Sequence, residues 1–386
     1  ASLLFEFTEN YKGTTKLSSF DDLAIQATYA DYDRTGQNTL IQYKEEANKN
    51  FGYEWKGDAS QLVEAKKLDL IASSEDPSDG ESATCIQTAN GKIYVSYHTN
   101  GDNLVGGNIE VASMNGSKKL VIEDSKKAAN IDYNHLIIDG NSLFLAGSQQ
   151  GNKANNVKGV GAFLGQVKLN GTSLGDNLTL YSINEKVDKI DANCVAKYGS
   201  DYVLATTNGF SVFDKDFNYW NNDGNLGKHV VTANGHLYTL TENGTVTVYD
   251  NSDMENGTSY QVGEVAPKGS KAVVAVDESN GDIYVCKGEN GVAKISNNSV
   301  NANFFTCPQN SKDKNEGNAN GVAVDAQNVY IACGGYGLVV LDKATGNVVC
   351  HRKAASGKSA NYVTVDADGN IYVAYGQSRI QVFKMT

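Results

Sequence analysis

The chain has 386 residues, of which 40% are hydrophobic and 20% charged, and its formal net charge is −12. This acidity excludes most nucleic-acid binders, because those proteins carry a basic stripe that displaces counterions from phosphates. No apolar run approaches the roughly 18 residues that a transmembrane helix needs. The first residues also lack the basic start and long apolar stretch of a signal peptide. We therefore predict no affinity for nucleic acid and no transmembrane segment.

In chain order, the first predicted element is an isolated strand, Leu3–Phe7, which has no partner nearby in the sequence. Residues 20–81 follow as a divergent unit, with apolar runs at 38–43, 50–55 and 61–68. These runs repeat the spacing of the unit that comes next. We predict that residues 20–81 form a first, divergent β-propeller blade.

From residue 82 onward one phrase recurs, a turn followed by a short apolar and aromatic strand. The copies are Asn90–Ser96, Gly140–Ala146, Asn234–Leu240, Asn280–Cys286, Gln327–Cys333 and Asp368–Ala374. They return roughly every 35–60 residues, a spacing typical of repeat architectures. Each copy follows one apolar strand and precedes two more with alternating polarity, which is the pattern of a four-stranded propeller blade. The repeated pattern therefore predicts seven clear blades over residues 82–386.

The sequence predicts an all-β, single-domain β-propeller over residues 1–386. Our preferred count is eight blades, with a seven-bladed ring and an N-terminal cap as the alternative. The last unit stops after its third strand, and a closed ring leaves no exposed edge. We therefore expect the strand within residues 1–10 to complete the last blade. The six cysteines fall in or at the ends of predicted strands, so we expect buried free thiols instead of disulfides.

The repeats are similar to two known families. The segment Gly334–Asp342, preceded by Val329–Cys333, resembles the LVIVD repeat, and Asp368–Ala374 resembles YVTN-type and related NHL-like propeller repeats. Members of these families are commonly exported or surface-attached bacterial proteins with binding or adhesion roles. The resemblance thus implies an exported protein in the periplasm or at the cell surface, anchored by lipid through a removed N-terminal segment.

One position near the start of each innermost strand carries a run of polar residues. An incomplete ring of amides around a tunnel offers donors and acceptors to a sugar, or carbonyl oxygens to Ca²⁺. The alternative is that each Asn caps an incoming loop by bonding its own backbone. With aromatic and basic residues near the loops between second and third strands, the predicted ligand-binding rim is Asn134, Asn193, Asn320, Asn361, Lys228, Tyr336, Tyr375, Arg379 and His98.

The next position holds Cys85, His135, Cys194 and His229 in consecutive units. Cys and His are the ligands that zinc prefers. Innermost strands are spread around an arc, however, and a wide tunnel separates equivalent side chains. We therefore predict no metal site and no cofactor, apart from a candidate Ca²⁺ ion in the amide ring.

The chain contains no recognisable catalytic motif, and no catalytic residue is predicted. We expect a monomeric, non-enzymatic module that binds a protein or glycan through its loop-rich rim, as in cell adhesion. The alternative is a cation-dependent tunnel hydrolase or lyase similar to the sugar lactonases. In that reading Asn193 and Asn320 supply the amides of the cation site, and Glu81 is the nearest candidate for its carboxylate.

Overall fold

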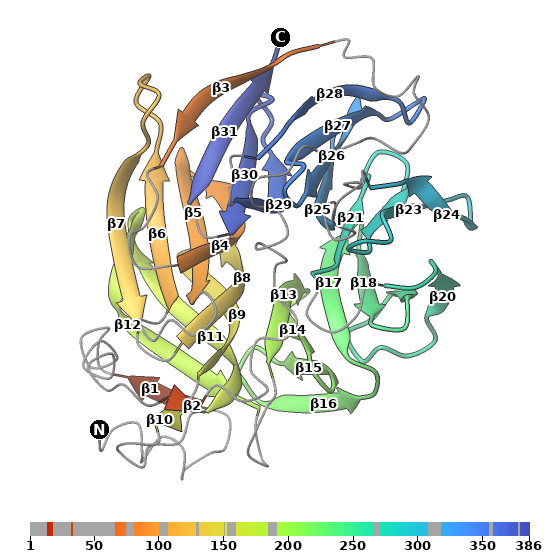
Figure 1. Ribbon diagram of the computed structural model, residues 1–386. Coiled ribbons are helices and arrows are strands. Elements are labelled where there is room, and N and C mark those ends of the chain that lie inside the picture. Colours follow the sequence, from red (N-terminus) through yellow and green to blue (C-terminus); the bar gives the residue numbers. More distant parts are fainter. Residues whose placement is uncertain are drawn as a thin grey trace.

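The computed structural model describes residues 14–17, 32–33, 66–74, 81–99, 107–128, 131–149, 151–152, 160–183, 191–265, 271–307, 318–354, 358–376 and 379–386. These residues form strands and turns and contain no helix. The strands make a β-propeller of seven four-stranded blades around a central axis (Figure 1). The all-β propeller prediction is confirmed, and the seven-bladed alternative fits the described residues.

We number the blades in chain order, each running from its innermost strand outward. Blade 1 contains β4 (Glu81–Ala89), β5 (Lys92–Thr99), β6 (Gly107–Ser113) and β7 (Val121–Ala128). Blade 2 contains β8 (Ile131–Asp139), β9 (Ser142–Gln149), β11 (Gly161–Asn170) and β12 (Ser173–Ser182). Blade 3 contains β13 (Ala192–Tyr198), β14 (Asp201–Thr206), β15 (Gly209–Phe213) and β16 (Tyr219–Asp223). Blade 4 contains β17 (Gly227–Ala233), β18 (His236–Thr241), β19 (Thr245–Tyr249) and β20 (Thr258–Gln261).

Blade 5 contains β21 (Val273–Val276), β22 (Ile283–Cys286), β23 (Val292–Ser296) and β24 (Ser299–Phe305). Blade 6 contains β25 (Ala319–Val324), β26 (Asn328–Cys333), β27 (Leu338–Asp342) and β28 (Val348–Arg352). Blade 7 contains β29 (Ser359–Val365), β30 (Ile371–Gly376), β31 (Ile380–Met385) and β3 (Leu68–Ser73). Three short strands lie outside this scheme: β1 (Thr14–Leu17) pairs with β12, and β2 (Tyr32–Asp33) pairs with β10 (Gly151–Asn152).

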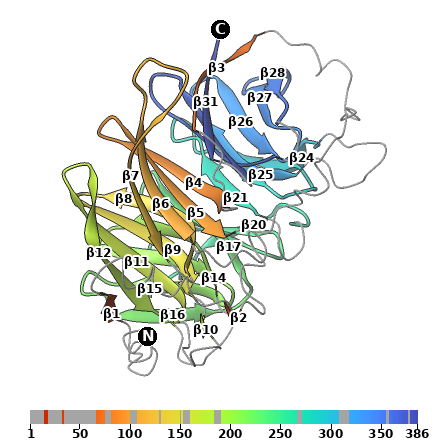
Figure 2. The same cartoon turned by 60° about the vertical axis from the view of Figure 1, so that its left-hand side comes forward.

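The eight-bladed prediction is wrong for the described residues, and so is the identity of the closing strand. An early strand does complete the last blade, but it is β3, which pairs antiparallel with β31 from Leu68↔Met385 to Ser73↔Gln381 (Figures 1 and 2). Because β30 takes the other edge of β31, no edge remains for Leu3–Phe7, which lies outside the described residues. Part of the expected divergent blade 20–81 is thus the outer strand of blade 7.

The end of β3 also joins the last blade to the first by backbone hydrogen bonds. The backbone of Ser73 bonds Lys118 and Leu120 of blade 1, with N···O distances of 2.8 and 2.9 Å. Blade 7 therefore contacts blade 1 through its outer strand as well as through its innermost one. This second contact supports closure after seven blades.

Apolar residues between the blades form the core, and the recurring turn phrase builds it. In blades 6 and 7 the strand after the turn buries an aromatic ring whose hydroxyl donates back to the turn aspartate, Tyr330 to Asp325 at 2.6 Å and Tyr372 to Asp366 at 2.8 Å. The same aspartates accept backbone amides two to four residues on. These Asp residues therefore hold the turns together, as Asp commonly does. All six cysteines are free and buried, which confirms the prediction for them.

Candidate functional site

The polar position near the start of the innermost strands is a β-bulge. In β4, β8, β13, β17, β25 and β29 the pairing register shifts there, so one residue is left without a cross-strand partner. We call this residue the bulge position. Its occupants are Thr84, Asn134, Asn193, Lys228, Asn320 and Asn361. A bulge turns its side chain away from the regular alternation of a strand, and here it reaches the neighbouring blade.

Four of the bulge side chains donate hydrogen bonds to the backbone of the next blade. The acceptor is always the carbonyl just before that blade's own bulge position. The bonds run from Thr84 to Tyr133 at 2.8 Å, Asn134 to Ala192 at 2.8 Å, Asn193 to Gly227 at 2.9 Å and Asn320 to Ala360 at 3.0 Å. These polar side chains therefore link neighbouring blades by hydrogen bonds. This contact differs from both interpretations of the sequence pattern, ligand binding and capping of the residue's own loop.

Asn361 makes a different contact. Its amide lies between the Ser359 carbonyl and the Gly376 backbone amide of its own blade. Asn361 is fully buried, and the other Asn residues of the ring are at most 8% exposed. The Asn side chains thus contact the scaffold, and their role in ligand binding stays a prediction.

The other predicted rim residues are buried or paired in separate places. Tyr336 stacks on His351 with ring centroids 4.8 Å apart, and Arg379 pairs with Glu110 and lies over the Tyr97 ring. The side chains of His98, Lys228 and Tyr375 are at most 5% exposed. Their role in ligand binding stays a prediction.

The position after the bulge, together with Val273 at the aligned position of blade 5, where β21 has no bulge, faces the central tunnel and forms its floor. We call this set the floor layer, and its members are Cys85, His135, Cys194, His229, Val273, Gly321 and Tyr362. His135 contacts His229 edge-on with ring centroids 5.8 Å apart, and its centroid lies 6.5 Å from that of Tyr362. The expectation that a wide tunnel separates these side chains is wrong, because seven blades make a narrower ring than eight and the rings meet.

Within the described part of the chain, one group of His, Cys, Asp and Glu side chains gathers as metal ligands do. It is His135, Cys194 and His229, whose ligand atoms lie within 4.8 Å of one another. Glu81, the candidate carboxylate of the lactonase-like alternative, lies elsewhere in an ion pair with Lys127 at 3.5 Å. The cation site of that alternative stays a prediction.

The histidines of the floor layer accept a hydrogen bond at the ring nitrogen from which a metal-binding histidine would donate one. The Nδ1 atoms of His135 and His229 accept the backbone amides of Val195 at 3.3 Å and Val274 at 3.2 Å. A neutral imidazole that accepts at Nδ1 carries its proton on Nε2, so neither ring nitrogen is left to bind a metal. Metal-binding histidines instead donate from the second nitrogen. The floor layer does not fit zinc.

The thiols of this layer also contact the next blade. The Cys85 sulfur donates to the Leu136 carbonyl at 3.7 Å and the Cys194 sulfur to the Val230 carbonyl at 3.1 Å. Burial raises the pKa of the Cys194 thiol, and the adjacent imidazoles lower it by more. The short contact with Val230, however, is that of a sulfur that keeps its proton, because a thiolate repels a carbonyl oxygen.

Lys271 precedes β21 and crosses the floor of the tunnel. Its Nζ donates to the Thr84 carbonyl in blade 1 and lies 4.7 Å from the centroid of the Tyr362 ring. Burial lowers the pKa of Lys271 to about 8, and the groups that oppose this shift are cysteines, with no carboxylate among them. A buried ammonium thus lies at the floor of the tunnel without a carboxylate counterion.

The position of Lys271 predicts a stability that rises with pH. The folded state loses this proton near pH 8, whereas an unfolded lysine keeps it to about 10.4. Between these values the unfolded state binds more protons, so unfolding becomes less favourable as pH increases. From pH 7.5 to 9.5 the gain from this residue is about 2 kcal/mol. Urea titrations of the wild type and Lys271→Met at both pH values measure it, and equal pH dependence in the two proteins contradicts it.

A cavity of about 470 Å³ occupies the tunnel beyond the floor layer. Its wall is mainly aliphatic, with side chains from the innermost strands of all seven blades, among them Ile137, Val231, Ala275 and Ala323. These wall residues are half-buried, whereas the floor residues are buried, so the cavity opens at the end of the strands opposite the bulges. The predicted rim lies at the other end, so the described residues place this cavity away from it.

A second hollow, of about 480 Å³, lies between blades 5 and 6. We call it the interblade groove. It is lined by Lys66, Asn280, Asp282, Lys294, Ala326, Gln327, Asn328, Asp342, Lys343, Ala344 and Val349. Most of these residues come from turns, because the turns after β21, β25 and β27 converge here. The lining is predominantly polar and carries charges of both signs.

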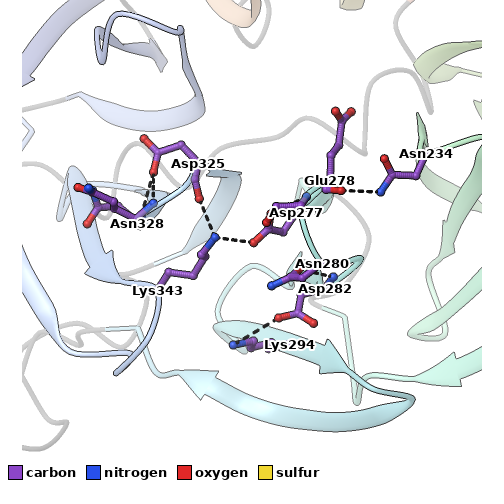
Figure 3. Close-up of polar contacts among 11 residues, drawn as sticks. Asn234, Asp277, Glu278, Asn280, Asp282, Lys294, Asp325, Asn328 and Lys343 are labelled. Atoms are coloured by element: carbon purple, nitrogen blue, oxygen red, sulfur yellow. Dashed lines mark hydrogen bonds and ion pairs between the residues drawn. The ribbon is translucent and has the colours of Figure 1, made fainter.

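Lys343 fixes the two sides of the groove relative to each other. Its Nζ donates to Asp277 of blade 5 at 2.7 Å and to the Asp325 carbonyl of blade 6 at 3.1 Å (Figure 3). Burial raises the pKa of Asp277, but Lys343 and Ser279 lower it by more, so this carboxylate is charged at neutral pH. Nearby, Lys294 lies 3.8 Å from Asp282. The groove thus has rigid sides with its charges paired at the base.

Sequence reasoning missed this groove. Asp277 and Asp325 also hold their own turns, because they accept the backbone amides of Ser279 at 3.1 Å and Asn328 at 2.9 Å. The signal that was overlooked is Lys343, a basic residue directly after the last residue of β27. Its partner lies 66 residues earlier in the chain, so only the packing of the blades reveals the pair.

Comparisons with known proteins identify the fold alone. No protein-family model and no curated protein sequence matches the chain. The WD40 β-propeller domain of Doa1 is similar in structure, with a TM-score of 0.55 and 10% sequence identity over 82% of this chain and 97% of that chain. The extracellular domain of the hybrid two component system BT4673 from B. thetaiotaomicron is similar with a TM-score of 0.51 and 12% identity, over 82% of this chain and 39% of that chain. Among the described residues, no helix has the length and hydropathy that crossing a bilayer requires. The chain therefore has the architecture of WD40-type β-propellers, a fold compatible with a binding module.

Proposed function

We propose that this protein is a non-enzymatic binding module that recognises a protein or glycan through the interblade groove. The observation that carries the proposal is a groove of about 480 Å³ with a predominantly polar lining on turns that Lys343 holds together. Binding sites commonly consist of loop residues on a rigid scaffold. The volume is within the range of small-ligand pockets, which suits one or a few sugar units or a polar peptide segment.

The exposed residues of the groove provide the recognition surface. Asn280, Gln327 and Lys66 are exposed, and their amides and ammonium donate or accept hydrogen bonds. Asp282 and Lys294 lie deeper and add a charge of each sign. This composition favours a ligand with many hydroxyl or amide groups over an apolar one. The groove is separate from the rim predicted from the sequence, whose role in ligand binding stays a prediction.

We also propose that the protein acts outside the cytoplasm, as the resemblance to LVIVD and YVTN-type repeats implies. One structural neighbour is an extracellular domain, which supports this location by analogy at the level of the fold. Fractionation of the producing cell with antibodies against residues 66–386 tests it. Recovery in the cytosolic fraction alone contradicts it.

Binding to a glycan array and to a displayed peptide library tests the groove. Gln327→Arg and Ala344→Arg fill the groove from two exposed turn positions for which the structure describes no side-chain bond. We expect each variant to weaken the best ligand at least tenfold, which corresponds to about 1.4 kcal/mol.

Ser200→Arg is the matched control, because it places the same side chain in the corresponding exposed turn of blade 3. A ligand that tolerates both groove variants as well as the control overturns the assignment to the groove. Calcium-dependent hydrolysis of a sugar lactone by the purified protein overturns the non-enzymatic reading and supports the tunnel hydrolase instead.

A further inference from the structure

The floor of the central tunnel presents a hydrogen-bond donor that has no acceptor. His229 is 6% exposed, and its Nε2 has no hydrogen-bond partner among the described residues. Its Nδ1 accepts the Val274 amide at 3.2 Å, so Nε2 carries the proton. An unpaired buried N–H destabilises the folded protein, because it has given up its hydrogen bond to water. A ligand acceptor in the tunnel removes this cost.

Two further groups make the floor attractive to a negative charge. His135 has the same tautomer, because its Nδ1 accepts the Val195 amide at 3.3 Å. The ammonium of Lys271 lies over the Tyr362 ring, and no carboxylate contributes to its pKa shift. A buried cation without a counterion is stabilised strongly by an anion that enters the same low-dielectric region.

The remaining titratable groups of the floor do not supply a negative charge. Burial raises the pKa of Tyr362, which therefore stays a neutral phenol at neutral pH. Burial raises the pKa of the Cys85 and Cys194 thiols, but the adjacent His135 imidazole lowers it by more. Burial lowers the pKa of His135, but the same two sulfurs raise it by more, to about 10. The geometry nevertheless assigns neutral groups, because both sulfurs donate to backbone carbonyls, of Leu136 and Val230, and the Nδ1 atom of His135 accepts the Val195 amide. At neutral pH the floor thus combines one ammonium and imidazole N–H donors with neutral thiols and a phenol.

The wall of the tunnel selects the rest of the ligand. Above the floor the cavity of about 470 Å³ is bounded by aliphatic side chains such as Ile137, Val231 and Ala275. Gln87, Lys197, Thr232 and Thr364 add polar groups to this wall. An apolar ligand body gains free energy here by leaving water. The cavity thus has an ammonium and imidazole N–H donors at its floor and a mainly aliphatic wall.

We propose that the central tunnel binds a small carboxylic acid with an apolar body, its carboxylate at His229 and His135 and its body along the aliphatic wall. The carboxylate accepts the Nε2 hydrogen of His229 and lies within the field of Lys271. A medium-chain fatty acid has a suitable size and shape. This site is separate from the interblade groove in position and chemistry, so either proposal can fail without the other.

Titration calorimetry with sodium octanoate tests the proposal, with octanamide and octanol as neutral probes of the same length. We expect octanoate to bind the wild type at least tenfold more tightly than either neutral probe. Lys271→Met and His229→Phe remove the charge and the donor, and each is expected to abolish this preference while leaving weak binding of octanol.

Val231→Trp is the steric control, because it blocks the wall and leaves the floor intact. We expect it to abolish binding of all three probes, and its circular dichroism and melting curve report whether it is folded. No heat from octanoate, benzoate or dodecanoate at millimolar concentration overturns the proposal, as does octanoate binding that Val231→Trp leaves unchanged. Stabilisation by Zn²⁺ that His229→Phe removes also overturns it, because the floor is then a metal site.

Discussion

A chain that begins at residue 75 is expected not to fold cooperatively, whereas a chain that begins at residue 66 is expected to keep the closed seven-bladed ring and to lose only the pairings of β1 with β12 and of β2 with β10, which lie outside the blades. The difference between the two is β3, the strand that completes blade 7. Without β3, the edge of β31 is exposed and five residue pairs of the sheet are lost. At about 1 kcal/mol for each hydrogen bond the loss is on the order of 5 kcal/mol. That is comparable with the whole stability of many domains.

The loss also reaches the core and blade 1. Ala72 is fully buried and Leu68 is 8% exposed, so their removal uncovers apolar neighbours such as Phe383. The backbone bonds from Ser73 to Lys118 and Leu120 disappear as well. An exposed apolar strand edge is a template for aggregation. Size-exclusion chromatography and urea unfolding of both truncations measure the effect, and a monomeric, cooperatively folded chain from residue 75 contradicts the closure by β3.

Gly337→Ala is expected to destabilise the protein by about 3–4 kcal/mol, because two separate costs add there. Gly337 lies in the turn between β26 and β27 with φ of +87°, where an L-residue is strained by about 1–2 kcal/mol. A Cβ atom at this position would also collide with backbone atoms of blade 6, the Arg352 carbonyl oxygen and the Ala354 amide nitrogen. Backbone atoms in a sheet cannot move aside as a flexible side chain can.

Gly369→Ala separates the two costs. Gly369 has a similar φ of +81°, but a Cβ atom there meets nothing within 4 Å. We expect this variant to be destabilised only by the conformational cost, about 1–2 kcal/mol. Chemical unfolding of both variants gives the comparison. Equal destabilisation by the two substitutions would show that the close approach of Arg352 and Ala354 does not contribute.

The candidate sites were only partly predictable. The Cys and His residues of the floor layer stood out in the sequence because they recur at one aligned position, but their meeting across the axis did not follow from it. The bulge position was equally conspicuous, yet its amides bond the backbone of the next blade, as Asn320 does with Ala360. A repeat reveals which residues are equivalent around a ring. It does not reveal whether their side chains point to the centre or to a neighbour, because one extra residue in a strand changes that direction.

The sequence by itself determined that four-stranded units repeat around an axis, because turn residues and alternating apolar residues are local signals that act within about ten positions. It also determined the burial of the cysteines. Only the tertiary structure decided the number of blades, the closing strand, the groove that Lys343 fastens and the charge at the tunnel floor. Each of these depends on pairs such as Leu68 with Met385, or Lys271 with Thr84, which lie far apart in the chain. No local pattern encodes such pairs, since they form only when the ring closes.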